Sequence, residues 1–142
     1  MRSSYVLVAA RCIFGIFYAA NGLAITAYLI FDFGLPPKHP KPAVNAFAEA
    51  LIQSGIIGPL LAMTYIFGGL ALLRDRTAPL GIVLLAPAVS VIFCFHIFLS
   101  GSWIWGTLNL LWLSALAYVY RESFTPLWNG AAAKPPRPSA GA

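Results

Sequence analysis

The chain has 142 residues, of which 60% are hydrophobic and only 9% are charged. A soluble domain carries roughly 25% charged residues, so this composition excludes an ordinary water-soluble protein and indicates a lipid bilayer. The formal net charge of +5 comes from nine Lys and Arg residues against four Asp and Glu residues, and the length suits a single domain.

Residues 12–31 are the first stretch without a charged side chain. A helix needs about 20 mostly apolar residues to cross a hydrocarbon layer of about 30 Å, and this stretch meets that length. A secretory signal peptide has a shorter apolar region, of about 7–15 residues. Because the run here is longer and follows Arg11, we predict a retained membrane anchor.

Residues 32–42 contain four prolines, which exclude a continuous helix and indicate a loop. In residues 43–54 the pattern changes. The apolar side chains of Phe47 and Leu51 fall near one face of a helix, and Glu49 falls near another. We predict a short amphipathic helix that lies at the outer membrane interface.

Three further spans are predicted over residues 56–73, 79–99 and 103–120, all apolar in sequence. The connection between the last two is only Ser-Gly-Ser, which predicts an antiparallel hairpin. Aromatic residues near the two ends of the last span are typical of the membrane–water interfaces. They are Trp103, Trp105, Tyr118 and Tyr120.

These segments predict an all-α membrane protein: a bundle of four transmembrane helices with a short amphipathic outer helix between spans 1 and 2. Residues 1–128 would form a single transmembrane domain. Residues 129–142 are rich in Pro, Ala and Gly, which predicts a disordered cytoplasmic tail.

The positive charges predict the orientation, because cytoplasmic loops of membrane proteins carry an excess of Lys and Arg. Seven of these residues fall on one side of the predicted topology and two on the other. We therefore predict a multi-pass protein of the cell (inner) membrane with both termini cytoplasmic. The inner seven are Arg2, Arg11, Arg74, Arg76, Arg121, Lys134 and Arg137, and the outer two are Lys38 and Lys41. Arg11 is expected to extend toward inner-leaflet phosphates.

His96, near the outer end of the third span, is the first candidate for a ligand pocket. A neutral imidazole can donate to a quinone carbonyl, accept a proton or bind a metal. The alternative is a polar tie that hydrogen-bonds Ser90, Asn109 or a backbone carbonyl. Asn21, Asn109 and Tyr28 are predicted to line an outward-facing pocket with His96, unless they serve ordinary interhelical hydrogen bonding.

Gly15, Ala19 and Gly22 recur on one face of the first span. Small residues let helices approach closely in lipid, so this stripe predicts a helix–helix contact. Pro87 removes one backbone hydrogen bond and predicts a kink in the third span.

The two cysteines do not form a metal-type pattern, and they lie near opposite surfaces of the predicted bundle. The helical rise separates them by about 20 Å along the membrane normal, whereas a disulfide needs Cα atoms within about 7 Å. We predict that Cys12 and Cys94 are free, buried and apolar in behaviour. Asp32, Glu49 and His39 are predicted to be solvated loop groups, and no metal site or catalytic residue set is predicted.

Short motifs along the chain resemble those of the DoxX-like family of four-helix integral membrane proteins. The resemblance covers about residues 11–124 and rests on the order and spacing of the motifs. They are Arg11 with Gly15 and Asn21-Gly22-Leu23, Pro36-Pro37, Phe47 to Gly55, Gly68 to Leu73 with Pro79-Leu80, Leu85-Ala86-Pro87, and Phe95 to Leu99. Many relatives have a glutamate in place of Tyr65 and an asparagine in place of Ser90, so proton-coupled chemistry is not expected here.

The resemblance implies a non-catalytic or weakly catalytic membrane component of a quinone- or sulfur-linked redox system. Such a component would hold a hydrophobic ligand, with quinone as the implied cofactor class, or a partner enzyme. A small permease, a lipid-binding protein and a purely structural membrane subunit are the alternatives. The expected partners are the lipid bilayer and either a redox enzyme subunit or a second copy of the chain. The few basic residues are spread over loops and do not form a nucleic-acid surface.

Overall fold

The computed structural model describes residues 5–32 and 38–128. Within these ranges the chain is helical and has no strand, which confirms the all-α prediction. The tail predicted to be disordered, residues 129–142, lies outside the described residues.

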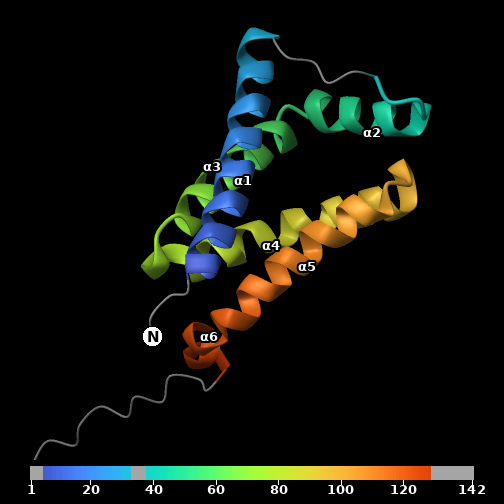
Figure 1. The fold of residues 1–142 in the computed structure, drawn as a ribbon. Coiled ribbons are helices and arrows are strands. Elements are labelled where there is room, and N and C mark those ends of the chain that lie inside the picture. The colour runs from blue at the N-terminus through green and yellow to red at the C-terminus, as the bar shows by residue number, and fades with distance from the viewer. Residues whose placement is uncertain (1–4, 33–37, 129–142) are drawn as a thin grey trace, which may run out of the picture.

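The predicted spans and the amphipathic segment all correspond to helices of the structure, and the amphipathic segment becomes α2 (Figure 1). One further helix, α6, has no counterpart in the sequence-based prediction. In chain order the elements are α1 (Tyr5–Phe31), α2 (Pro42–Gln53), α3 (Ile57–Leu72), the 3₁₀ turn η1 (Asp75–Thr77), α4 (Ala78–Cys94), the π-helical turn η2 (Phe95–Ser100), α5 (Trp103–Val119) and α6 (Arg121–Trp128).

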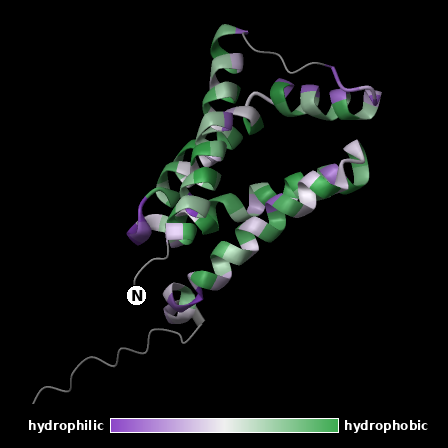
Figure 2. Ribbon diagram, in the orientation of Figure 1, coloured by the Kyte–Doolittle hydropathy of each residue, from purple (hydrophilic) through white to green (hydrophobic). Residues whose placement is uncertain are grey.

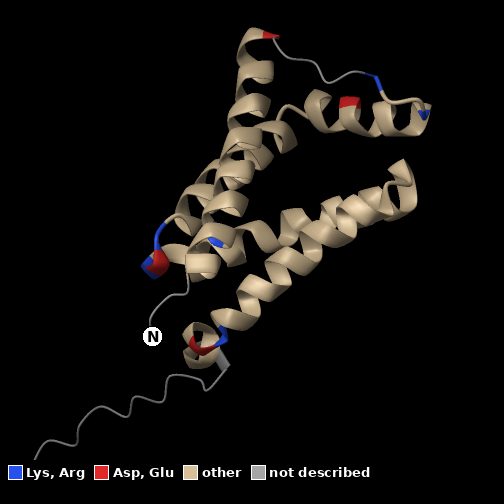
Figure 3. Ribbon diagram, in the orientation of Figure 1, with Lys and Arg blue, Asp and Glu red and all other residues tan. Residues whose placement is uncertain are grey.

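Among the described residues, two helices are long and apolar enough to cross a membrane. They are α1 and the helix Asp75–Ser100, which joins η1, α4 and η2. Helices α2 and α3 also qualify as a pair, but they are bent by 89° at the break between them, and α5 is a shorter apolar helix. Hydrophobic residues dominate the long helices in Figure 2, and Figure 3 shows charged residues mostly near helix ends. The chain is therefore a helical membrane protein.

Helices α1 and α3 pack with their backbones almost in contact (Figure 1). A Cβ atom built on Gly69 would lie 2.5 Å from the carbonyl oxygen of Gly15 and 2.6 Å from the nitrogen of Ala19. One built on Gly22 would lie 2.8 Å from the carbonyl oxygen of Ala62. Real Cβ atoms do not approach so closely, so the predicted small-residue stripe is the contact surface between these helices. We call it the α1–α3 seam.

The seam continues into α4 through the other face of α3. A Cβ on Gly81 of α4 would lie 2.7 Å from the carbonyl oxygen of Gly68, and one on Gly68 would lie 2.7 Å from Leu85. The fully buried side chains of Leu72 and Leu85 fill the space around these glycines. Small residues thus bring α1, α3 and α4 together, and the core forms where they meet. It consists of Phe14, Tyr18, Tyr65, Leu72, Ala78, Ile82, Leu85, Ala88, Val89, Leu113 and Leu116.

Aromatic side chains, rather than close backbones, connect α5 to α1. The ring of Trp112 stacks on Phe14 at 5.5 Å, and the ring of Trp105 meets Phe17 edge-on at 5.9 Å. In Figure 1 the α4–α5 hairpin runs at an angle to the α1–α3 pair, and α2 extends from the start of α3 toward the tip of the hairpin. Large aromatic rings suit the wider separation between α1 and α5 because they extend across it.

The third predicted span is one helix that changes character near its end. Pro87 lies inside α4 with its side chain exposed, and the helix continues on both sides of it. The last six residues, η2, form a π-helical turn that ends where Gly101 adopts φ 82° and its N–H donates to the carbonyl of His96 at 3.0 Å. Glycine suits this left-handed position because it has no Cβ. The positive φ turns the chain directly into α5.

Replacing Gly22 tests the seam. Gly22→Leu is expected to lower the free energy of unfolding by about 2–3 kcal/mol, because the new side chain has no room against α3. Ala20→Leu is the matched control, since Ala20 is exposed on the same helix. Thermal unfolding in detergent should show that Gly22→Leu lowers the Tm and that Ala20→Leu leaves it unchanged. Equal melting temperatures would contradict the close packing.

Candidate functional site

A pocket of about 300 Å³ lies where α2 crosses the start of α3 and the end of α1. Its walls are apolar except for one amide and one phenol, those of Asn21 and Tyr28. The lining residues are Asn21, Ala24, Ile25 and Tyr28 from α1, Ala48, Leu51 and Ile52 from α2, and Gly58 and Leu61 from α3. We call this space the α2 pocket.

The spacing of residues along α1 puts both polar groups in the α2 pocket. Asn21 and Tyr28 are seven residues apart, which is close to two helical turns, so they share one face of α1. The Nδ2 of Asn21 donates to the carbonyl of Phe17 at 2.8 Å, an intrahelical bond that leaves Oδ1 as a hydrogen-bond acceptor. The pocket therefore combines an apolar body with a small polar wall, as many small-molecule sites do.

Asn109, a second predicted pocket residue, is buried in the core instead. Its Oδ1 accepts from the hydroxyl of Tyr18 at 3.0 Å, and its Nδ2 donates to the carbonyl of Trp105 at 2.9 Å. Both ends of the amide are thus bonded within the protein. Asn109 fits the alternative that the sequence left open, an interhelical hydrogen bond between α1 and α5.

His96 lies in η2, near the hairpin tip and away from the lining of the α2 pocket. Its Nδ1 pairs with the hydroxyl of Ser100 at 2.8 Å, and that hydroxyl also accepts the N–H of Ser102 at 3.2 Å. Gly106 of α5 lies directly against it, since a Cβ there would be 2.8 Å from the His96 Cβ. Ser90, a partner proposed from sequence, donates to the carbonyl of Ala86.

The structure thus divides the four predicted pocket residues among three places. Asn21 and Tyr28 share the α2 pocket, Asn109 ties α1 to α5, and His96 helps to shape the hairpin tip. Helix rotation decides which neighbour a side chain meets, and the sequence pattern did not define it for α4 and α5.

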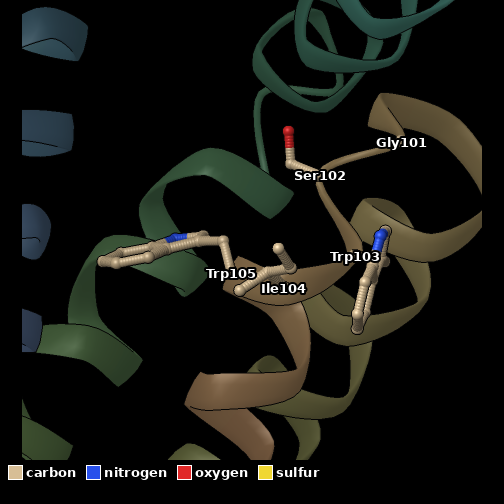
Figure 4. A pocket seen from close by; sticks show the side chains of 5 residues that line it. All are labelled: Gly101, Ser102, Trp103, Ile104 and Trp105. Carbon is tan, nitrogen blue, oxygen red and sulfur yellow. The ribbon is translucent and has the colours of Figure 1, made fainter.

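A second hollow, at the start of α5, has a volume of about 340 Å³ and is formed by Gly101 to Trp105 (Figure 4). The indole rings of Trp103 and Trp105 point in different directions, and that of Trp105 reaches toward α1. There it meets Phe17, one helical turn from Asn21. Aromatic rings therefore close the space between α1 and α5 next to Asn21.

An apolar groove of about 440 Å³ runs along α4 and η2, with Phe47 of α2 at one side. Cys94 lines this groove and is exposed, so the prediction that it is buried is wrong. The reason is helix rotation again, which turns Cys94 outward. Cys12 is half-buried, and both thiols are free. The groove is lined by Phe47, Ser90, Val91, Cys94, Phe95, Phe98 and Leu99.

A polar cluster around the buried side chain of Arg11, at the opposite end of the molecule, was not predicted. The guanidinium of Arg11, only 4% exposed, lies 2.6 Å from a carboxylate oxygen of Asp75 and donates to the Tyr120 hydroxyl at 2.8 Å. The Tyr120 hydroxyl in turn donates to Asp75. The expectation that Arg11 extends to lipid phosphates is therefore wrong. Asp75, an acid between Arg74 and Arg76, is the signal that could have identified this pairing.

The Arg11 cluster joins three parts of the chain. Arg11 belongs to α1 and Asp75 to η1, and Tyr120 is the residue that directly follows α5. The buried Nε of Arg11 has no hydrogen-bond partner among the described residues. A buried charge is costly unless it is paired and hydrogen-bonded. We infer that this cluster stabilises the packing of the helices and is not a ligand site.

Comparison with protein-family models, curated proteins and solved structures finds no match for this chain. The geometry of the described residues is therefore the basis for the functional argument. Within residues 5–32 and 38–128, no group of three or more His, Cys, Asp or Glu side chains is placed to hold a metal ion.

Asp75→Asn tests the Arg11 cluster. The amide keeps the shape of the side chain but removes its charge, so the buried guanidinium loses its anionic partner. We expect the free energy of unfolding to fall by about 1–3 kcal/mol, with part of the effect screened because Asp75 faces solvent. Glu122→Gln, at an exposed carboxylate on α6, should leave stability unchanged. Unfolding curves in detergent give both values, and an equal loss in the two variants would refute a specific role for Asp75.

Proposed function

We propose that this chain is a four-span membrane protein that holds a hydrophobic ligand in the α2 pocket, near the outer surface of the bilayer. The observation that carries the proposal is the pocket itself. It has apolar walls, an amide and a phenol on one side, and an amphipathic helix across it.

The four proposed spans are α1, α3, α4 with η2, and α5. Helix α3 has 16 residues and α5 has 17, and each continues into apolar or aromatic neighbours such as Leu73 and Tyr120. The 89° bend between α2 and α3 supports an interfacial position for α2, because a helix perpendicular to a span lies along the membrane surface.

The charged residues support the orientation with both termini cytoplasmic. Arg74, Arg76 and Arg121 lie at the end of the molecule that holds η1 and α6, whereas Lys38 and Lys41 lie near α2 (Figure 3). An excess of positive charge marks the cytoplasmic side. In this orientation the α2 pocket faces the outer side of the inner membrane.

The pocket chemistry favours a ligand with an apolar body and a head group that exchanges hydrogen bonds. The Asn21 amide oxygen accepts such bonds, and the Tyr28 hydroxyl both donates and accepts them. A quinone and its reduced quinol together have this character, because the quinone carbonyl accepts from the Tyr28 hydroxyl and a quinol hydroxyl donates to the Asn21 amide oxygen. The resemblance to the DoxX-like family points to the same class. We therefore propose a ligand-holding component of a redox system. Its partners would be a redox enzyme subunit or a second copy of the chain.

A lipid-binding protein is the second candidate, and the apolar groove along α4 favours it. The lining of the groove is apolar apart from Ser90 and Cys94. The acyl chain of a lipid can bind to such a surface through apolar contacts alone. The two candidates differ in where the ligand lies, because a quinone head would use Asn21 and Tyr28.

Cysteine labelling tests the topology. In a Cys12→Ser, Cys94→Ser background, an impermeant maleimide added to intact cells should react with Ser102→Cys and leave Arg76→Cys unlabelled. Permeabilised cells should label both positions, which controls for buried thiols. Outside labelling at position 76 with protection at position 102 would reverse the proposed orientation.

A pocket-filling substitution tests ligand binding. Ala24→Phe is expected to raise the Kd for decyl-benzoquinone about tenfold, equivalent to about 1.4 kcal/mol, because the new ring occupies the cavity. Quenching of tryptophan fluorescence in detergent gives the Kd. Ala20→Phe, one turn earlier and outside the pocket lining, is the matched control.

If both variants bind the quinone as the parent protein does, the α2 pocket is not the site. The second candidate is tested with palmitate in the same assay. If the protein binds palmitate and Ala24→Phe does not change the Kd, a lipid in the groove along α4 is favoured.

A further inference from the structure

Helix α2 is attached to the rest of the protein far more weakly than the other long helices. Only Val44 of its 12 residues is buried, whereas six residues of α3 and six of α4 are buried. Segments with few buried apolar contacts open at low free-energy cost. Of the three helices that line the α2 pocket, α2 is thus the most easily displaced.

The contacts of α2 with the hairpin tip are few and lie at its first half. The Lys41 ammonium donates to the carbonyl of Leu99 at 3.4 Å, a long hydrogen bond, and lies near Gly101. The ring of Phe47 packs on Phe95 at 5.4 Å between centroids. We call these two contacts the clasp.

A local hydrogen-bond network holds the start of α2 together as one unit. The N–H of His39 donates to Asn45 Oδ1 at 2.8 Å, and Asn45 Nδ2 returns a bond to the His39 carbonyl at 2.9 Å. The N–H of Lys41 donates to the His39 imidazole at 3.1 Å. The clasp lysine is therefore positioned by α2 itself and would move with it.

The other end of α2 has the properties of a hinge. The chain bends by 89° between α2 and α3, and Gly55 in the bend has φ 68°. Among the described residues other than its two chain neighbours, nothing lies within 4 Å of a Cβ built at Gly55. One hydrogen bond crosses the bend, from the N–H of Ile57 to the Ser54 hydroxyl at 3.0 Å, and rotation of α2 about Gly55 has to break it.

We propose that α2 is a lid that swings on Gly55 and is held closed by the clasp at Lys41 and Phe47. Its inner side, through Ala48, Leu51 and Ile52, forms one wall of the α2 pocket. Displacement of α2 removes that wall and widens the pocket, in which Asn21, Ala24 and Ala48 are already exposed. This inference rests on the proposed function for the identity of the ligand, but the lid motion itself can be measured without one.

Thiol accessibility measures the lid directly. In a Cys12→Ser, Cys94→Ser background, Ile25→Cys places one thiol on the half-buried wall of the pocket. Adding Lys41→Met should increase its rate of reaction with N-ethylmaleimide about fivefold, the factor expected for loss of one hydrogen bond. Adding Phe47→Ala, a second variant that weakens the clasp, should increase the rate in the same direction. Lys38→Met, at an exposed lysine three residues before Lys41, is the matched control and should not change the rate.

The same proteins separate the lid from the proposed function. With decyl-benzoquinone as the probe, stopped-flow fluorescence should show faster association and faster dissociation in Lys41→Met, with a smaller change in Kd. Labelling that does not accelerate in either clasp variant overturns the lid, even if the quinone binds. Accelerated labelling in proteins that never bind the quinone supports the lid and refutes the ligand.

Discussion

The close approach of α1 and α3 is the constraint on which the rest of the structure depends. Lipid supplies no hydrophobic driving force between helices, so van der Waals packing of backbones has to replace it. Gly15, Gly22 and Gly69 permit that packing because any side chain there would meet the opposite backbone. The seam fixes the face of α1 that meets α3. The adjoining face, with Asn21 and Tyr28, is thereby directed to the α2 pocket.

Polar groups follow the same requirement that every group in the bilayer finds a partner. The hydroxyls of Thr26, Thr64 and Ser90 donate to carbonyls one turn earlier in their own helices. Asn109 and Tyr18 satisfy each other across two helices. Asn21 differs, because its amide makes one intrahelical bond and otherwise faces a cavity. This difference distinguishes a candidate ligand contact from a structural tie.

The sequence predicted the helices well because long apolar runs mark them and prolines lie at their boundaries. Residues 43–54, for example, correspond to Pro42–Gln53. It also predicted the seam, since that depends on spacing within one helix. The predicted pocket also included Asn109 and His96, which the structure places away from Asn21 and Tyr28. The sequence did not predict the neighbours of His96 and Asn109. Asn109 bonds to Tyr18 of α1, and that contact depends on how α5 is rotated against α1. The pairing of Arg11 with Asp75, 64 residues later, depends on tertiary packing in the same way.

The unequal lengths of the helices have a consequence for the surrounding lipid. Helix α1, with 27 residues, is about 40 Å long, and α3, with 16, is about 24 Å. In the proposed four-span arrangement no flat hydrocarbon layer of about 30 Å would match both, so the long helix would tilt and the bilayer would thin beside the short one. A four-span chain of this kind would be sensitive to membrane thickness. Its stability and its distribution between thick and thin membrane regions would then depend on the acyl chains around it.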